Sequence, residues 1–149
     1  GGIKFSGDIA KAIAAGADAI MMGSIFAGTD ESPGKKFKFR GKLYKQYRGM
    51  GSIGAMSSGS ANRYFQKNYK DKSKFVPEGV EGRVEYKGSV SKIIYQLQGG
   101  LRSSMGYIGA KNLSQIRKNA KFIKITKAGF YESMVHSVEM TQKTINYKL

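Results

Sequence analysis

Three glycine-bearing segments carry residue types that could hold a phosphate group. Glycine leaves backbone N–H groups accessible to an anion, and the hydroxyls of Ser24 and Tyr47 add further donors. In parallel α/β folds, ligands bind beyond the carboxyl ends of strands, where the first two segments are expected to lie. On glycine spacing alone, ordinary turns are the better explanation. The segments are Gly1-Gly2-Ile3, Gly23-Ser24 and Tyr47-Arg48-Gly49-Met50-Gly51-Ser52.

A basic and aromatic stretch holds the other residues that could do chemistry. We expect residues 62–82 to form a long mobile loop, and long loops inside compact domains are often functional. The loop contains Arg63-Tyr64-Phe65, but an arginine is a poor general base because its pKa in water lies above about 12. Glu78 is a single carboxylate that could accept an N–H from a base. Most such residues are solvated surface groups, so residue type alone leaves both functional assignments open.

Composition excludes several kinds of site. The 149 residues contain no cysteine, which excludes disulfides, thiolate metal sites and a cysteine nucleophile within them. His136 is the only histidine, so a zinc site is a poor hypothesis. The net charge of +16 raises nucleic-acid binding as a secondary hypothesis, although the lysines are scattered along the chain. We find no membrane span or signal peptide and expect a cytoplasmic location.

The first half of the chain predicts a fragment of a parallel α/β unit followed by a hairpin. Ser6 is expected to cap a helix that ends at Gly16. The continuous apolar run Ala19–Met22 predicts a strand buried on both faces. Residues 36–40 and 42–47 alternate charged and apolar side chains around Arg40-Gly41, which predicts a hairpin with one solvated face.

The second half predicts mainly helices. A short helix is expected within residues 49–59, and a longer one over Ser89–Met105 with a single apolar stripe. Gly99-Gly100 inside the longer helix predicts a close backbone contact. Asn112 is expected to cap a helix at residues 113–119, and residues 122–125 to form a strand. The tail from residue 127 is expected to be ordered only against a partner.

The chain resembles the C-terminal part of the inosine-5′-monophosphate (IMP) dehydrogenase family. One such motif would be weak evidence, whereas the ordered set over nearly the whole chain is very specific. The matching stretches, in the family's order, are Gly1-Gly2-Ile3 with Ser6-Gly7-Asp8-Ile9, Met22-Gly23-Ser24 with Ala27-Gly28-Thr29, Tyr47-Arg48-Gly49-Met50-Gly51-Ser52, Asn62-Arg63-Tyr64-Phe65, Pro77-Glu78-Gly79-Val80-Glu81-Gly82, Tyr86-Lys87-Gly88-Ser89, and Gln98-Gly99-Gly100-Leu101-Arg102-Ser103 with Gly106-Tyr107.

The resemblance implies a fold and a division of the chain. The family fold is an α/β (β/α)8 TIM barrel, of which this chain would be the C-terminal part, with a hairpin and flap inserted after the last strand. Residues 1–29 would be the last helix–strand unit of the barrel. Residues 30–87 would hold the hairpin, active-site loop and flap, and residues 88–149 the C-terminal helices and tail.

The resemblance also implies an activity: oxidation of IMP to XMP with NAD+ in guanine nucleotide synthesis. A cysteine attacks the hypoxanthine base, hydride passes to NAD+, and water hydrolyses the covalent intermediate. The flap closes after NADH leaves, and its arginine helps to activate that water. The site residues implied are Gly2, Gly23, Ser24 and Tyr47 on the IMP phosphate, Gly49, Met50 and Gly51 along the base, Glu78 hydrogen-bonded to the base, and Arg63 and Tyr64 as the catalytic residues of the flap.

A potassium ion and a homotetramer follow from the same resemblance. Backbone carbonyls of Glu132, Ser133 and Met134 would bind the ion, which the family shares with a neighbouring subunit. The family usually has histidine where Met134 stands, and carbonyl ligands are indifferent to that difference. Lys35 and Glu85 also depart from the family pattern, at positions where we expect no chemistry.

The catalytic cysteine of the family is expected upstream of Gly1, together with the ribose-binding aspartate and most barrel strands. This segment alone is therefore expected to be inactive and poorly folded. Three alternatives stay open: a fragment of a GMP reductase-like barrel, a non-catalytic basic fragment that binds nucleotides or RNA, and a split-gene subunit that assembles with a separate N-terminal chain. The flap motif Asn62–Phe65 and the tail motif at Glu132 favour the dehydrogenase over the reductase, because only hydrolysis needs a water-activating flap.

Overall fold

The computed structural model describes residues 1–68 and 71–141, which form two compact units. Unit 1 combines Gly1–Met22 with the described part of Ile93–Leu149, and unit 2 is Gly23–Lys92. Each unit has its own small core. None of the helices in the described ranges is both long and apolar enough to cross a membrane.

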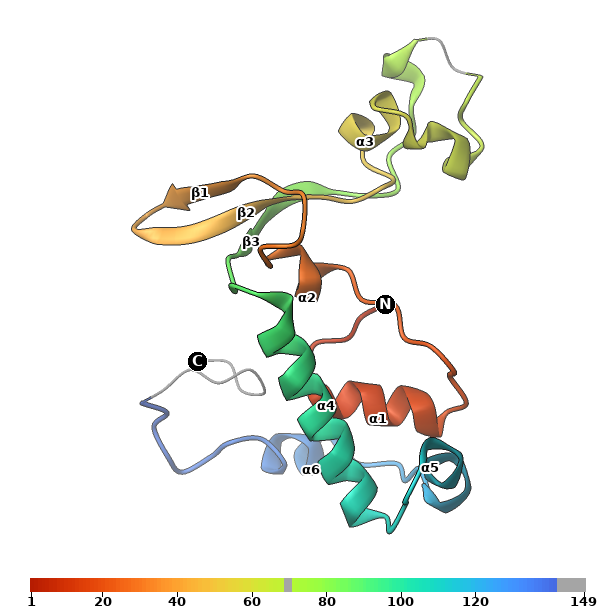
Figure 1. Cartoon of the computed structure of the whole chain (residues 1–149), viewed down its shortest axis with the longest axis vertical. Helices are drawn as coiled ribbons and strands as arrows, with labels where there is room; N and C mark the ends of the chain where they lie inside the picture. Colours follow the sequence, from red (N-terminus) through yellow and green to blue (C-terminus); the bar gives the residue numbers. More distant parts are fainter. Residues whose placement is uncertain (69–70, 142–149) are drawn as a thin grey trace. The chain divides into compact units, whose positions relative to one another are not determined.

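Unit 1 is built on the packing of helix α1 (Ser6–Ala14) against helix α5 (Leu113–Asn119) (Figure 1). Ile13 of α1 is 6% exposed and Ile116 of α5 is 1% exposed, so both are core residues. The carboxylate of Asp8 accepts hydrogen bonds from the backbone N–H groups before α1, each at 2.9 Å. The predicted cap at Ser6 is wrong, because Ser6 is the first helical residue and Phe5 is the N-cap, whose N–H donates to Asp8 in the first turn.

Helix α4 (Val90–Tyr107) confirms the predicted long helix, and its Ile93 and Leu97 are buried. A Cβ added at Gly100 would overlap the side chain of Ser6, so the predicted close contact is confirmed there. Gly99 has open space around its Cα atom and makes no such contact. Helix α5 also begins as predicted, because the side chain of Asn112 accepts a hydrogen bond from the backbone of its first turn.

Two predicted strands do not form. Residues 19–22 have no strand partner, and Met21 is 71% exposed. Residues 122–125 are likewise irregular, with Ile123 81% exposed. A strand needs a neighbour for its hydrogen bonds, and no described strand runs beside either segment. The tail instead carries a helix that the sequence analysis missed, α6 (Lys127–Glu132), capped by the hydroxyl of Thr126.

Unit 2 contains an antiparallel three-stranded sheet in the order β1-β2-β3 (Figure 1). Strands β1 (Lys36–Phe39) and β2 (Lys42–Arg48) confirm the predicted hairpin. Arg40 and Gly41 both have positive φ, at 46° and 76°, as a two-residue hairpin turn requires. Strand β3 (Glu81–Glu85) was not predicted, and it takes residues 81–82 out of the expected loop.

Charged and aromatic side chains stack on one face of this sheet. Phe37 and Phe39 lie about the ring of Tyr44, with centroids 6.3 and 6.2 Å apart. The guanidinium of Arg83 lies 3.7 Å from the centroid of Phe39. Cross-strand pairs of this kind contribute roughly 0.2–1 kcal/mol each and help to fix the register of the strands.

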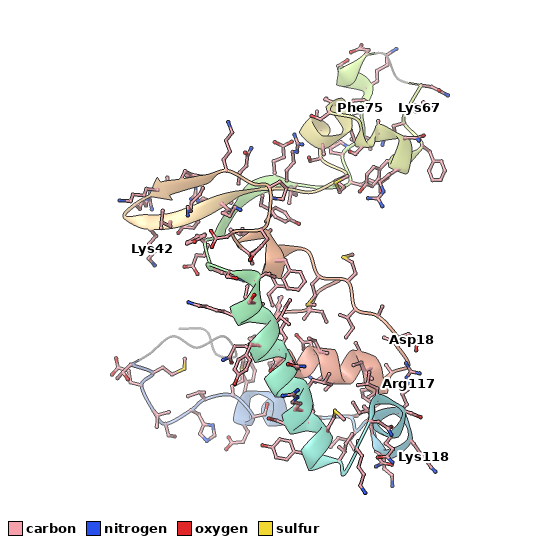
Figure 2. All side chains as sticks on the ribbon, in the orientation of Figure 1. Asp18, Lys42, Lys67, Phe75, Arg117 and Lys118 are labelled. Atoms are coloured by element: carbon pink, nitrogen blue, oxygen red, sulfur yellow. The ribbon has the colours of Figure 1, made fainter. Side chains whose placement is uncertain are left out.

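Short helices complete unit 2. Helix α2 (Ser24–Ala27) precedes the hairpin, and helix α3 (Ile53–Ser57) confirms the short helix expected within residues 49–59. Two 3-10 helices follow, η1 (Ser60–Tyr64) and η2 (Lys72–Lys74). Met56 of α3 is 2% exposed and is the centre of this small core. Figure 2 shows Lys67 and Phe75 on the segment that follows η1.

The loop between α2 and β1 joins several elements of unit 2. The ammonium of Lys45 donates hydrogen bonds to backbone carbonyls of this loop, and the side chain is only 4% exposed. The carboxylate of Glu31 accepts bonds from the N–H of Val90 at 2.9 Å and from the hydroxyl of Ser89 at 3.0 Å. Chiefly the Val90 bond lowers the pKa of Glu31 below its usual 4.5. The contribution of Glu31 to folding stability is therefore fully present above about pH 4.5, and it is lost as the pH falls through the lowered pKa.

The described residues thus form a small α/β structure with an antiparallel sheet, in which the barrel strand expected at residues 19–22 is not formed. The barrel, the flap insertion and the three-segment division of the chain stay predictions.

We expect the isolated chain to melt broadly and to bind a dye that reports exposed apolar surface. Large apolar side chains are widely exposed, including Met21, Tyr107 at 90% and Phe122 at 66%, and exposed apolar surface promotes association. Differential scanning calorimetry with anilinonaphthalene sulfonate fluorescence tests this expectation. A sharp, cooperative transition without dye binding would contradict it.

Candidate functional site

The glycine-rich turn after β2 lies beside the segment that leads into β3. The β2–β3 ladder ends with the pair Arg48 and Glu81. The two segments stay hydrogen-bonded beyond this pair. The N–H of Gly49 donates to the carbonyl of Val80 at 2.9 Å. The carbonyl of Gly51 accepts from the N–H groups of Glu78 and Gly79, at 2.9 and 3.0 Å. The structure thus brings together the predicted base contacts Gly49, Met50, Gly51 and Glu78.

Glycine is required at this junction because the backbones approach closely. A Cβ at Gly51 would lie 3.0 Å from two ring atoms of Tyr64 and 3.2 Å from the Cβ of Glu78. A Cβ at Gly79 would lie 2.9 Å from the backbone nitrogen of Ser52, closer than real Cβ atoms approach backbone. The ring of Tyr64 therefore lies on Gly51, which adds one member of the predicted catalytic pair to the cluster.

Helix α3 holds the turn from the other side. Ser52 is only 2% exposed. Its Oγ atom accepts a hydrogen bond from the N–H of Ala55 and caps the helix. The carboxylate of Glu81 accepts from the N–H of Gly54 at 2.9 Å, and the hydroxyl of Ser60 donates to the carbonyl of Met50 at 2.5 Å. The backbone of the turn is thus fixed, while the side chains of Met50 and Glu78 are exposed to solvent. Such a surface can stack a planar ring on Met50 and accept its N–H at Glu78.

Arg63 and Tyr64 lie on η1 and differ in environment. Tyr64 is half-buried against Gly51, whereas Arg63 is exposed. Phe65 ends the helix in the left-handed conformation, with φ of 57°, and is 99% exposed. A non-glycine residue in this conformation stores strain of about 1–3 kcal/mol and often marks functional segments. The mobility predicted for this loop stays a prediction.

Sequence reasoning missed Gln66, which holds the two ends of the following loop together. Its side-chain amide donates to the carbonyl of Val76 at 3.0 Å and accepts from the N–H of the same residue at 2.9 Å. Gln66 is buried, so these bonds are shielded from water. Within the loop, the hydroxyl and N–H of Ser73 donate to Asp71, and these bonds lower the pKa of Asp71. No signal in the local sequence distinguishes Gln66 from its polar neighbours.

The predicted phosphate-binding residues are divided between the two units. Gly23 and Ser24 begin α2 and are exposed, and Tyr47 lies on β2 opposite Gly82. All three belong to unit 2. Gly2 has a φ of 81° and belongs to unit 1, so its placement beside the others stays a prediction.

Lys45 is the second residue that sequence reasoning missed. Leu43, Lys45 and Tyr47 alternate along β2 and therefore share one face of the sheet. This alternation places Lys45 between Leu43 and Tyr47, but it does not indicate which groups partner the charge. Its contacts with the loop after α2 connect this strand to the Ser24 segment.

The predicted potassium ligands lie at the end of α6. Glu132 is its last residue, Ser133 is the C-cap and Met134 follows. The last carbonyls of a helix have no intrahelical donor, and a hard cation prefers such oxygens, so the donor set fits the ion chemically. His136 contacts the carbonyl of Met134 at 2.9 Å and the carboxylate of Glu132 at 3.2 Å. Within the described ranges, no group of three or more His, Cys, Asp or Glu side chains could hold a metal.

Comparison with known proteins identifies the class of protein. The family model of the IMP dehydrogenase / GMP reductase domain matches residues 1–136. The chain is 57% identical over 149 residues to the inosine-5′-monophosphate dehydrogenase of Chlorobaculum parvum, covering 99% of this chain. It is 57% identical over 147 residues to that of Helicobacter pylori, again over 99% of this chain, and 52% identical over its full length to that of Streptococcus pyogenes.

The chain therefore belongs to the IMP dehydrogenase / GMP reductase family, as its motifs predicted. It spans about 30% of the length of these relatives.

We expect Gly79→Ala to destabilise the site and Gly82→Ala to leave it intact. The new Cβ at position 79 would meet the backbone of Ser52 and Gly51, which cannot move without breaking the paired segments. Overpacking of this kind costs about 1–3 kcal/mol. Position 82 has no atom within 4 Å of the added Cβ and is the matched control.

The measurement is chemical denaturation, together with limited proteolysis across residues 62–80, of the longer protein that contains this chain. Equal stability of the two variants would contradict the packing described for Gly79.

Proposed function

We propose that this chain is the C-terminal part of an IMP dehydrogenase, which oxidises IMP to XMP in guanine nucleotide synthesis. The observation that carries the proposal is the cluster of Gly51, Glu78 and Tyr64. These residues come from three separate segments, and the family resemblance assigns two of the segments to the base and one to the flap. Their hydrogen bonds and close contacts support a common site. The catalytic cysteine belongs to the upstream part of the protein in this proposal.

In the proposed site each residue of this chain has a separate task. The Gly49–Gly51 turn contacts the hypoxanthine base, and the carboxylate of Glu78 accepts an N–H from it. Ser24 and Tyr47, with Gly2 and Gly23, bind the 5′-phosphate through hydroxyl and backbone donors. When bound, NAD+ accepts the hydride, and we assign no residue of this chain to it.

Arg63 and Tyr64 act in the hydrolytic step of the proposed reaction. Arg63 helps to remove a proton from the attacking water once the flap has closed, because a closed site lowers the cost of its neutral form. Tyr64 lies on Gly51 and directs the flap toward the base. Potassium, held by carbonyls of Glu132, Ser133 and Met134, and a homotetramer that shares the ion between subunits belong to the same proposal.

Two alternatives are less well supported. A GMP reductase has no hydrolytic step and therefore no need of Arg63. A nucleic-acid-binding fragment would need open aromatic faces beside cations. The hairpin carries exposed cations at Lys38 and Lys42, and Arg83 already lies over the ring of Phe39. The exposed ring of Phe65 lies in the segment that the proposal assigns to the flap. Binding that ignores the IMP base and weakens steeply with salt would favour this alternative.

The test uses the complete enzyme, either the native longer protein or this chain joined to the upstream part of the Chlorobaculum parvum relative. We expect Arg63→Ala to slow XMP release by about 100-fold and hydride transfer by less than about threefold, since general-base assistance contributes 10²–10⁴-fold. Rapid mixing should therefore show a full burst of NADH followed by slow turnover.

Lys67→Ala is the matched control, because Lys67 is an exposed cation on the same loop. It should leave both rates unchanged. Equal loss of both steps in Arg63→Ala would overturn the flap assignment, and absence of any IMP-dependent NADH formation would overturn the proposed function.

A further inference from the structure

The ammonium of Lys45 is buried among backbone carbonyls of a single loop. Its Nζ atom donates to the carbonyl of Thr29 at 2.6 Å and also to that of Ser32, and it lies 3.4 Å from that of Asp30. The side chain is 4% exposed, so these bonds replace those that water would make. The described partners of the cation are neutral carbonyls. A buried cation is tolerated only while such partners stay in place, so Lys45 fixes the loop relative to β2.

Hydrogen bonds connect this loop to helix α2. Thr29 is 1% exposed, and its hydroxyl donates to the carbonyl of Phe26 at 2.8 Å. The N–H groups of Phe26 and Ala27 donate in turn to the carbonyl of Gly23, at 3.1 and 3.0 Å. An unbroken series of short hydrogen bonds therefore runs from Lys45 through Thr29 to the turn at Gly23 and Ser24.

Tyr47, the other proposed phosphate ligand, lies on the same strand as Lys45, β2. Tyr47 is two residues beyond Lys45, so the two side chains share one face of the sheet. Immediately beside them, the N–H of Gln46 donates to the carbonyl of Lys35 at 2.8 Å, which holds the end of the loop to β2 as well. The contacts that hold this loop on β2 therefore help to set the separation between the Ser24 segment and Tyr47, together with the direct packing of α2 on β2.

We propose that Lys45 is the positioning residue that holds Ser24 and Tyr47 at the separation needed to bind a phosphate monoester dianion. This inference rests on the proposed function, which makes those two residues ligands of the IMP phosphate. Lys45 touches no substrate in it. The ammonium acts by fixing the loop, and Thr29 relays the constraint to α2.

The test measures steady-state kinetics of the complete enzyme carrying Lys45→Met, which keeps the length of the side chain and removes its donors. We expect KM for IMP to rise about tenfold, the effect of impairing roughly one hydrogen bond to a charged group. We expect kcat and KM for NAD+ to stay within about twofold, since the base and the flap are held by other contacts. Lys38→Met, an exposed lysine of β1, is the matched control and should change neither constant.

Thr29→Val is the second variant, because Lys45→Met leaves buried carbonyls without donors and could fail to fold. Valine has the shape of threonine and removes the hydroxyl, which donates to the carbonyl of Phe26 and also interacts with the carboxylate of Glu31. We expect a smaller rise in KM for IMP, about threefold, again with unchanged KM for NAD+.

The outcomes separate the inference from the proposed function. An active parent enzyme whose variants keep the KM for IMP within twofold would overturn the positioning role and leave the proposed function standing. Loss of kcat with parallel rises in both KM values would show a general structural role and also overturn it. A parent enzyme that forms no NADH from IMP would instead overturn the proposed function.

Discussion

Unit 2 depends on the burial of one cation. Lys45 lies at the centre of the middle strand, where a charged side chain is costly unless its hydrogen-bond donors are matched. The loop after α2 supplies the matching carbonyls and is thereby fixed over the strand. The same loop places Glu31 at the start of α4 and Asp30 against the hydroxyl of Tyr86. Helix α2, the sheet and the first turn of α4 are therefore connected through a single loop, which Lys45 holds on the middle strand.

The strand that carries Lys45, β2, leads directly into the candidate site. Beyond Tyr47 it leaves the sheet as the glycine-rich turn, and its pairing with β3 continues as the bonds between Gly51 and residues 78–79. Backbone hydrogen bonds of this kind fix the turn relative to residues 78–80, because each bond constrains both segments. The absence of Cβ atoms is what lets the chains approach. Glycine at these positions is thus a packing requirement, whatever ligand the turn binds.

The sequence predicted elements whose cause is local and failed where the cause is remote. Helix α4, the Asn112 cap of α5 and the Arg40-Gly41 turn all depend on residues close in sequence, and all three are confirmed. Of the apolar stripe of α4, Ile93 and Leu97 are buried, whereas Ile94 is 50% exposed. A parallel strand at residues 19–22 needs neighbours that the described chain does not contain. Strand β3 was missed because its sequence, Glu81-Gly82-Arg83-Val84-Glu85, is polar and contains glycine. Only its pairing with β2 makes it a strand.

The residues of the candidate site also fall into two groups, those that the sequence predicted and those that only the structure shows. The family resemblance assigned the Gly49–Gly51 turn and Glu78 to one site, and backbone hydrogen bonds bring these two segments together. Lys45 and Gln66 were missed because their partners are carbonyl and N–H groups, which every residue has and which leave no trace in the pattern of side chains. Buried polar side chains that hold loops are therefore found from structure, whereas the residues proposed to bind a ligand come from motifs.

The position of Tyr64 links the two steps of the proposed reaction. Its ring lies on Gly51, the surface along which the base is proposed to bind. Arg63 is the preceding residue of the same short 3-10 helix, and neighbouring residues of such a turn move together. Any displacement of η1 that changes the space over Gly51 must therefore also move the guanidinium that is proposed to activate water. The strained Phe65 and the buried clamp of Gln66 lie immediately after this helix, so they bound the segment that would have to move. In the proposed enzyme, access to the base and activation of the water are consequently coupled by covalent connection rather than by a contact that could be lost separately.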